Sequence, residues 1–363
     1  MQRCLRRSLR SLIRIPTTLD EQDESSYRPV TDNNKETIMS IIAMDDRIDE
    51  ILDMSRQKNI GELSPWFQNS LKALVADGQF LAEGSIRVLA DDLITDLSDY
   101  QEKTKRQMVA IGMSGGVDSA LTAALFRDAG WRVVGVTMPI HQEAVETERG
   151  IAACVALGID HIHIDLSSLY DMTVNDLSLA TDPLILSDDK AGRIRRGNVR
   201  ARLRMITLYN LAQANHGLVA STDNLTELAA GFWTLHGDVG DLSPIQSLTK
   251  SWEVPMMAKM MGVPESVWRA TPTDGLGIDN GDEAQLGASY LEWDIMFLML
   301  DFIHRYQLGF DDARATEVYK AVTDRIALTW FKRKNPMNLD HAFFSRYDYL
   351  ERIDSMFRPT IFD

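Results

Sequence analysis

The residues with the clearest chemical potential lie in the stretch MVAIGMSGGVDSALTAALF, residues 108–126. An apolar, β-prone run precedes the glycine pair and an alanine- and leucine-rich run follows it, which predicts a strand that turns into a helix. In such a turn the unpaired backbone amides and the helix dipole point at the same spot and favour an anion. Gly115 and Gly116 permit positive φ, and Ser114 and Ser119 add hydroxyl donors. The sequence therefore predicts a phosphate site here.

Asp118 is the informative residue of this loop, because a carboxylate repels phosphate unless a cation lies between them. Magnesium prefers one or two carboxylates plus phosphate oxygens, so the loop indicates a nucleotide bound with Mg²⁺. The loop is not the GxxxxGK[ST] motif, since no lysine follows the glycines, and the spacing of its glycines does not fit GxGxxG. A strand-to-helix turn with a capping aspartate is the alternative interpretation.

Four segments downstream combine charged residues with glycine, serine or threonine: RRGNVRARLRMITLYNLAQ at 195–213, STDNLTELAAGF at 221–232, HGDVGDLSPIQSLTK at 236–250 and TPTDGLGIDNGDEAQLG at 271–287. The first predicts the basic start of an amphipathic helix, with Asn198 as its cap. The second places Asp223 and Glu227 four residues apart on a helix, which is typical of a solvated acidic face. The last two have the composition of loops. Taken alone, each segment has a plain structural interpretation.

Taken together and in order, these strings resemble one family, the ammonia-dependent NAD synthetases, which are ATP pyrophosphatases. The strings that match the family's motifs, over about residues 85–340, are SGGVDS, GNVRARLRM, TDNLTE, GDVGDLSPI, LTK and PTDGLGIDNGDEAQLG. The resemblance implies amidation of nicotinic acid adenine dinucleotide (deamido-NAD) to NAD through an acyl-adenylate. In that reaction ATP is the co-substrate, ammonia is the nitrogen donor, and AMP and pyrophosphate are released.

The resemblance also implies roles for individual residues. Those that it gives to ATP are Gly112, Met113, Ser114, Gly115, Gly116, Val117, Asp118, Ser119, Thr222, Lys250 and Thr273. Those that it gives to Mg²⁺ are Asp118 and Glu227. Those that it gives to the second substrate, deamido-NAD, are Arg202, Asp241, Phe331 and Lys332. We expect Arg202 to be buried and to pair with a phosphate or carboxylate of the dinucleotide. No covalent nucleophile is expected.

The chain departs from the family in two places. Where the family has TKYGDGGAD this chain has TLHGDVGD, so Leu235 replaces a substrate-contacting lysine and the loop is one residue shorter. The N-terminal part, of about 80 residues, matches nothing in the family. It is too short for the nitrilase-like amidase that lets some NAD synthetases use glutamine, so a separate amidase partner is the alternative source of nitrogen.

Two rival functions stay open on the sequence. One is another ATP pyrophosphatase that adenylates a different acid or a tRNA base. The formal net charge of -15 argues against it, and against nucleic-acid or anionic-membrane partners in general, because such partners need a basic surface. The other rival is a non-catalytic nucleotide sensor, for which Leu235 is the one hint. The family implies a homodimer, and the apolar helices near 198–216 and 286–303 suit either its interface or the core.

The elements that must position these residues alternate along the chain. Apolar, β-branched runs at 108–113, 132–139, 159–165 and 218–222 predict strands, and helical segments separate them. Such connections require right-handed crossovers, so we expect an α/β fold with a doubly wound, Rossmann-like parallel sheet flanked by helices, and extra helices at both ends. Ligands bind beyond the carboxyl ends of the strands in these sheets, where SGGVDS, TMP and STDN lie.

Composition divides the chain into four expected parts. They are a disordered or targeting extension at 1–40, a helical N-terminal region at 41–100, the NAD synthetase-like α/β domain at 101–340 and a C-terminal tail at 341–363. Helical spacing of apolar residues is visible at 43–57 and 64–100.

The cellular setting follows from the cysteines and the apolar runs. Two cysteines, Cys4 and Cys154, are too few for a disulfide framework, and they favour a cytoplasmic protein. The arginine-rich start leaves an organelle presequence or an extension read from an upstream start codon as alternatives. We expect no membrane span, because no apolar run approaches ~20 residues and the longest is interrupted by Asp294 and Asp301.

Overall fold

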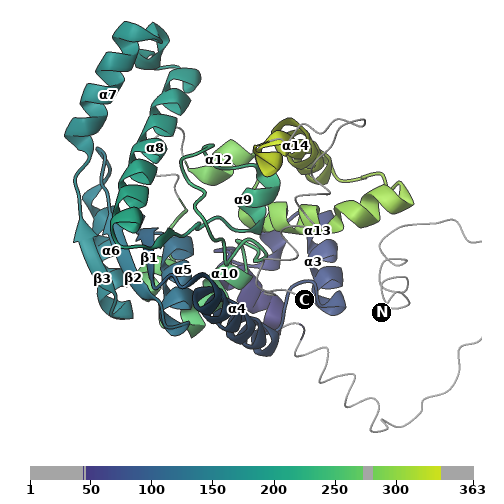
Figure 1. The fold of residues 1–363 in the computed structure, drawn as a ribbon. Helices are drawn as coiled ribbons and strands as arrows, with labels where there is room; N and C mark the ends of the chain where they lie inside the picture. The colour runs from purple at the N-terminus through teal and green to yellow at the C-terminus, as the bar shows by residue number, and fades with distance from the viewer. Residues whose placement is uncertain (1–43, 45, 273–280, 337–363) are drawn as a thin grey trace, which may run out of the picture.

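A four-stranded parallel sheet with strand order β3-β2-β1-β4 lies at the centre of the fold (Figure 1). The computed structural model describes residue 44 and residues 46–272 and 281–336. The chain order reverses between β1 and β4, which makes a topological switch point at the carboxyl ends of the strands. The predicted doubly wound α/β sheet is confirmed, although β4 is shorter than the run at 218–222 suggested. The strands are β1 (Met108–Gly112), β2 (Arg132–Thr137), β3 (Asp160–His163) and β4 (Leu218–Val219).

The central strands β1 and β2 are buried on both faces, as expected of a sheet covered by helices on each side. Val109 and Ile111 face a large core shared with α4, α5, α6 and α10, whereas Ala110 and Val134 face a second core shared with α7 and α8. Helices α7 and α8 lie side by side and project beyond the sheet (Figure 1). These six helices are α4 (Glu83–Thr104), α5 (Val117–Asp128), α6 (Ala144–Leu157), α7 (Ser167–Ala180), α8 (Lys190–Ala214) and α10 (Glu253–Met260).

A second group of helices completes the large core, with α13 packed between α3 and α14. It includes α3 (Pro65–Asp77), α9 (Leu225–Ala230), α11 (Glu265–Trp268), α12 (Asp282–Leu286), α13 (Tyr290–Tyr306) and α14 (Ala313–Thr329). Short 3-10 helices are η1 (Ile60–Glu62), η2 (Pro183–Leu186) and η3 (Trp330–Lys334). Within the described residues, no helix combines the length and apolar character that crossing a bilayer requires. The predicted division of the chain into four parts stays a prediction.

Two helix boundaries differ from the sequence prediction. The helical pattern at 64–100 is split because Gly78, at φ 79°, ends α3 in a left-handed cap before α4 begins. The helix expected from residue 198 begins at Lys190, where the Asp189 side chain accepts a hydrogen bond from Gly192 N at 2.7 Å. Asn198 is therefore inside α8, and its prediction as the cap was wrong because a better cap lies earlier in the chain.

The close packing of α6 on the sheet depends on Gly135 in β2, and we predict that Gly135→Ala destabilises the fold. A Cβ there would lie 2.6 Å from Cys154 Sγ and 2.9 Å from Met113 Cγ. Overpacking of this kind costs about 1–3 kcal/mol of unfolding free energy. Urea denaturation measures the loss, and Cys154→Ala in the same chain should recover part of it.

The matched control is Gly84→Ala in α4, where a new Cβ would meet nothing within 4 Å. Alanine is a better helix former than glycine, so this variant should be neutral or slightly stabilising. A double variant Gly135→Ala/Cys154→Ala that shows only the sum of the two single losses would contradict the proposed contact.

Candidate active site

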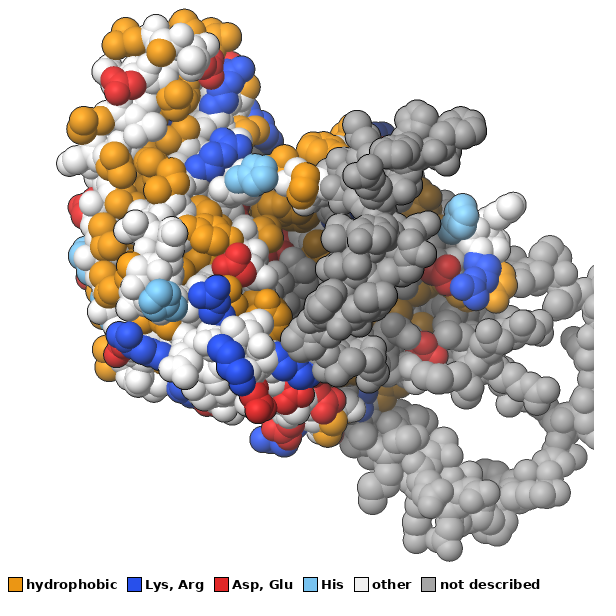
Figure 2. All heavy atoms as spheres, in the orientation of Figure 1, with side chains coloured by type: hydrophobic (Ala, Val, Ile, Leu, Met, Phe, Trp, Pro, Cys, Tyr) orange, Lys and Arg blue, Asp and Glu red, His pale blue; other side chains and the backbone are white. Residues whose placement is uncertain are grey.

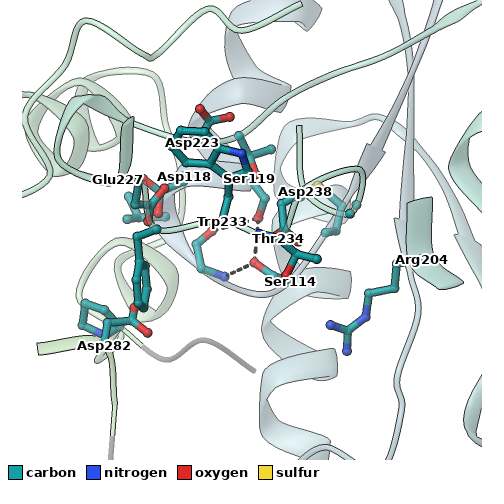
Figure 3. Close-up of a pocket in the computed structure, with 18 of the residues that line it drawn as sticks. Ser114, Asp118, Ser119, Arg204, Asp223, Glu227, Trp233, Thr234, Asp238 and Asp282 are labelled. Atoms are coloured by element: carbon teal, nitrogen blue, oxygen red, sulfur yellow. Dashed lines mark hydrogen bonds between the residues drawn. The ribbon is translucent and has the colours of Figure 1, made fainter. Parts of the chain in front are cut away.

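The predicted phosphate loop follows β1 directly and opens into a cavity of about 400 Å³ at the carboxyl ends of the strands. Gly115 has φ 84°, and a Cβ there would lie 2.2 Å from the Glu146 carbonyl oxygen, so the loop passes α6 at a distance that only glycine permits. Gly116, with φ -93°, does not use positive φ as expected. The Ser114 and Ser119 hydroxyls lie 3.3 Å apart (Figure 3). The loop residues that line the cavity are Gly112, Met113, Ser114, Gly116, Val117, Asp118 and Ser119.

Charged side chains from three separate segments meet on one wall of this cavity. The ammonium group of Lys250 pairs with Asp118, a residue 132 positions earlier in the chain. The Asn224 side chain joins the two predicted metal ligands: its Nδ2 donates to Asp118 Oδ1 at 3.0 Å, and its Oδ1 accepts from Glu227 N at 3.1 Å. Thr222, the other predicted ATP contact here, also lines the cavity. Asn224 and Glu227 form the capping box of α9. The start of this helix therefore holds the side chain of Glu227, one of the two predicted metal ligands, in place.

This wall holds more negative than positive charge. Asp223 and Asp282 are each 5% exposed and also line the cavity, beside Asp118 and Glu227. Enclosure by protein, reinforced by the charge of Asp118, raises the pKa of Glu227 well above its ordinary value. Burial also lowers the pKa of Lys250, but Asp118 and Glu227 outweigh it, and the net direction is upward. This wall thus keeps the ammonium group of Lys250 among several crowded carboxyl groups.

The donor set fits a magnesium ion. Asp118 and Glu227 present carboxylates to one cavity, and the Asp223 Oδ1 atom is buried with no hydrogen-bond partner among the described residues. In the described part of the chain, no group of three or more His, Cys, Asp or Glu residues is arranged to hold a metal alone. A cation here would therefore share its coordination with ligand oxygens, which is how Mg²⁺ is held beside phosphates.

The opposite end of the cavity carries two residues that the sequence analysis missed. Arg204 of α8 donates to the Met138 carbonyl at 3.1 Å and to Gln142 Oε1 at 2.8 Å, and its burial lowers its pKa to about 10. Asp238 accepts from Thr234 N at 2.6 Å, and its enclosed position raises its pKa. Figure 3 shows the Arg204 side chain extending beside the cavity, below Asp238. Both residues lie in strings that match the family's motifs, Arg204 in GNVRARLRM and Asp238 in GDVGDLSPI, but neither was singled out as a site residue.

The residues predicted to bind the second substrate do not all reach the cavity. Lys332 lines it and donates to the Gly231 carbonyl at 2.7 Å and the Trp233 carbonyl at 2.5 Å. Arg202 is exposed, so its expected burial was wrong: its neighbours in α8, Ala201 and Leu203, occupy the buried face. Its Nε donates to the Leu235 carbonyl at 3.3 Å.

Two further predicted substrate residues, Asp241 and Phe331, also lie outside the cavity lining. Asp241 accepts from Tyr209 Oη at 2.8 Å and from Val219 N at 2.9 Å, and Phe331 is 47% exposed. The predicted ATP contact Thr273 lies outside the described residues. The roles of these residues stay predictions.

The buried carboxyl groups predict that the ligand-free protein loses stability as pH rises from about 4 to about 8. Burial raises the pKa of Asp294 to about 6 and that of Glu253 to about 8. The folded protein therefore keeps protons that the unfolded chain releases in this window, and each further pH unit favours the unfolded chain. Urea denaturation across the range measures the slope.

Asp294→Asn should flatten the lower part of this profile. Its amide oxygen can still accept from Ser251, whose N and Oγ lie 2.9 and 2.6 Å from Asp294 Oδ2, and its amide nitrogen can donate to Thr226. The matched control is Asp301→Asn on the exposed side of the same helix, which should leave the slope unchanged. A free energy of unfolding that rises between pH about 5 and about 8 would contradict the prediction.

Removing one or the other of the two carboxylates beside Lys250 should change the free energy of unfolding in opposite directions at neutral pH. Glu227→Gln is expected to raise the free energy of unfolding by about 1 kcal/mol, because it removes an enclosed charge and keeps an oxygen for Asn224 N. Asp118→Asn is expected to lower it by about 1–3 kcal/mol, because it leaves a buried ammonium without its direct partner. Thermal denaturation compares the two, and equal shifts would show that the carboxylates are not in competition.

Known proteins with related sequences identify the family. The family model for NAD synthase matches residues 89–336. The chain is 35% identical over 207 residues to an NH(3)-dependent NAD(+) synthetase of Alkaliphilus metalliredigens, which covers 56% of this chain and 83% of that protein. It is 36% identical over 250 residues to one of Methanosarcina acetivorans, which covers 67% of this chain and 94% of that protein.

Solved structures give the same result. The NMN synthetase of Francisella tularensis superposes with a TM-score of 0.60 at 26% identity, over 70% of this chain and 99% of that one. An NH3-dependent NAD synthetase of Campylobacter jejuni superposes with a TM-score of 0.55 at 25% identity, over the same shares of the two chains. The family model, the relatives in sequence and the fold of the solved structures agree, and the chain belongs to the NAD synthase family.

Proposed function

We propose that this protein is an ammonia-dependent NAD synthetase: it converts deamido-NAD to NAD with ATP and ammonia, and releases AMP and pyrophosphate. The observation that carries the proposal is the meeting of Asp118, Glu227 and Lys250 in one cavity. These residues come from the three family motifs SGGVDS, TDNLTE and LTK, and the cavity lies at the switch point where α/β folds bind ligands.

The reaction needs activation because a carboxylate is a poor electrophile. The nicotinate carboxylate attacks the α-phosphorus of ATP, which forms an acyl-adenylate and releases pyrophosphate. Ammonia then attacks the activated carbonyl carbon, and AMP leaves. No protein nucleophile is required, so the protein acts by positioning the reactants and stabilising the developing charge.

The phosphate loop and Lys250 carry the ATP side of this chemistry. The first residues of α5 line the cavity, and backbone amides at this helix start, with the Ser114 hydroxyl, can hold the pyrophosphate part of ATP. Lys250 can turn from Asp118 to the phosphates once a cation shares that carboxylate. Asp118 and Glu227 would hold Mg²⁺, which when bound neutralises phosphate charge and polarises the oxygens it contacts. Lys332 brings a second ammonium to the far end of the cavity.

A second copy of the chain is the proposed partner. The arm formed by α7, η2 and α8 carries exposed apolar side chains, and Figure 2 shows orange patches along it. An apolar surface of this kind is typical of a protein interface. Arg202 and Tyr209 are exposed on α8 as well, so a homodimer through this arm would bring them next to the partner and could complete the nicotinate end of the site. The exposed apolar residues of the arm are Leu169, Met172, Leu179, Leu184, Leu186, Ile194 and Ile206.

The direct test is an assay of AMP and NAD with Mg²⁺–ATP, deamido-NAD and ammonium. We expect NAD from the wild-type protein, and a fall in kcat of about 10²–10³-fold or more in Lys250→Met, because the leaving pyrophosphate loses a buried cation. The matched control is Asp128→Asn, which lies at the exposed end of the same helix as Asp118 and pairs with Arg127. This control should keep its activity within about twofold.

Three outcomes would overturn parts of the proposal. Nucleotide binding without AMP formation from any acid would favour a sensor. Activity with glutamine alone would contradict ammonia dependence. Formation of NMN from nicotinic acid mononucleotide, in preference to NAD from the dinucleotide, would change the product to the one in the name of the Francisella relative.

A further inference from the structure

The segment that precedes the family match contacts two segments that line the active-site cavity. The matched region begins at residue 89, but a helix at 46–54 packs Ile48, Ile51 and Leu52 into the large core. Arg56 lies in the turn that follows this helix and has φ 63°. Arg56 N donates to the Asp53 carbonyl at 3.0 Å, and the next amide, at residue 57, donates to the Leu52 carbonyl at 2.8 Å. These bonds form the Schellman motif, in which glycine is the usual residue at positive φ.

An arginine at this position is unfavourable for the backbone, because a side chain in the left-handed region costs roughly 1 kcal/mol compared with glycine. The contacts of the Arg56 side chain account for an arginine at this position. Arg56 Nη1 donates to the Ala270 carbonyl at 3.3 Å, and Nη2 lies 4.0 Å from Glu283 Oε1. The guanidinium thus joins two segments that are separate in the chain.

Both of these segments belong to the cavity. Ala270 and Pro272 line it on one side, and Asp282 lines it next to Glu283. Arg56 also borders a smaller cavity of about 30 Å³, whose lining includes Lys250 and Tyr290. Arg56 therefore lies on the outer side of the cavity wall that carries the ammonium group of Lys250.

A second contact from the same helix end holds the same wall. Arg269 donates from both terminal nitrogens to the carboxylate of Asp53, at 3.2 and 2.7 Å, and lies 4.7 Å over the ring of Trp268. Both side chains are partly exposed, so the ion pair contributes little to global stability. The two parallel hydrogen bonds of this pair instead hold Arg269 in one orientation, and with it the next residue, Ala270, which lines the cavity.

We infer that Arg56 is a positioning residue for the ATP cavity: it holds Ala270–Pro272 and Asp282–Glu283 in the arrangement that receives the nucleotide. The inference rests on the proposed function, which makes ATP the ligand of this cavity. It gives the N-terminal segment a role that the family motifs do not contain.

The decisive variant is Arg56→Gly, because it separates stability from positioning. Glycine relieves the backbone at φ 63°, so the free energy of unfolding should stay the same or rise. Loss of the guanidinium should nevertheless weaken Mg²⁺–ATP binding by roughly three- to tenfold, seen by calorimetry and as a raised KM for ATP, with kcat within about twofold. Amide exchange at residues 269–271, measured without nucleotide, should become faster.

The matched control is Lys105→Gly. Lys105 is also a non-glycine residue in the left-handed region at a helix end, with φ 57°, and it is exposed at the end of α4. This variant should gain the same backbone relief without a change in ATP binding or in exchange at 269–271. A difference between the two variants that is confined to ATP binding and local exchange supports the inference.

Equal ATP affinity and equal exchange in the two glycine variants would overturn it, since Arg56 would then be only a helix end. Should Arg56→Gly fail to fold, Arg56→Lys decides, because it keeps the charge but lacks the fork that reaches both segments. In Arg56→Lys, amide exchange at residues 269–271 must then be faster than in the wild-type protein. An unchanged rate would reject the inference. Exchange needs no turnover, so a failure of NAD formation would count against the proposed function and not against Arg56.

Discussion

The structure depends on a buried ammonium that faces more carboxyl groups than it can neutralise. Lys250 is 8% exposed and pairs with Asp118, while Glu227 and Asp223 adjoin the same cavity. Desolvating such groups costs several kcal/mol per ion unless their partners are well placed. In the ligand-free site this crowding favours the protonated form of Glu227, whose pKa burial and the charge of Asp118 raise. A cation held there would favour the charged form and could in turn contact phosphate oxygens. When no ligand is bound, the surrounding fold has to hold these charged groups close together.

The fold supplies that support through buried hydrogen bonds from α13. Asp294 interrupts an apolar run in the sequence, and in the structure it accepts from Thr226 at the start of α9 and from Ser251 beside the lysine. Thr226 Oγ1 also accepts from Lys250 N at 3.3 Å. One buried carboxyl group thus ties together the two segments that carry Glu227 and Lys250. Its burial is unfavourable in isolation, but each of its oxygens is satisfied.

The sequence predicts best where the chemistry is local. The strand, the glycine turn and Asp118 lie within one short stretch, so spacing alone indicates a phosphate site and excludes two other nucleotide motifs. The residues of α8 could not be predicted equally well, because the face that each arginine occupies depends on packing against the sheet. That packing turns Arg204 to the cavity and Arg202 to solvent. Asp238 reaches the cavity through a turn that a hydrogen bond from Thr234, four residues earlier, closes, and neither helix nor strand periodicity predicts such a turn.

Net charge and site charge act on different length scales. The chain carries -15 overall, and ATP is itself a polyanion, so long-range forces oppose its approach. At physiological ionic strength, charges more than about 8 Å apart in solvent are largely screened, whereas enclosed charges are not. The groups that decide binding are therefore the cationic side chains that line the cavity, together with whatever cation the carboxylates hold. These side chains are Arg149, Arg204, Lys250, Arg325 and Lys332. An acidic protein can bind an acidic nucleotide because its surface charges are screened, whereas the cationic side chains enclosed in the cavity are screened much less.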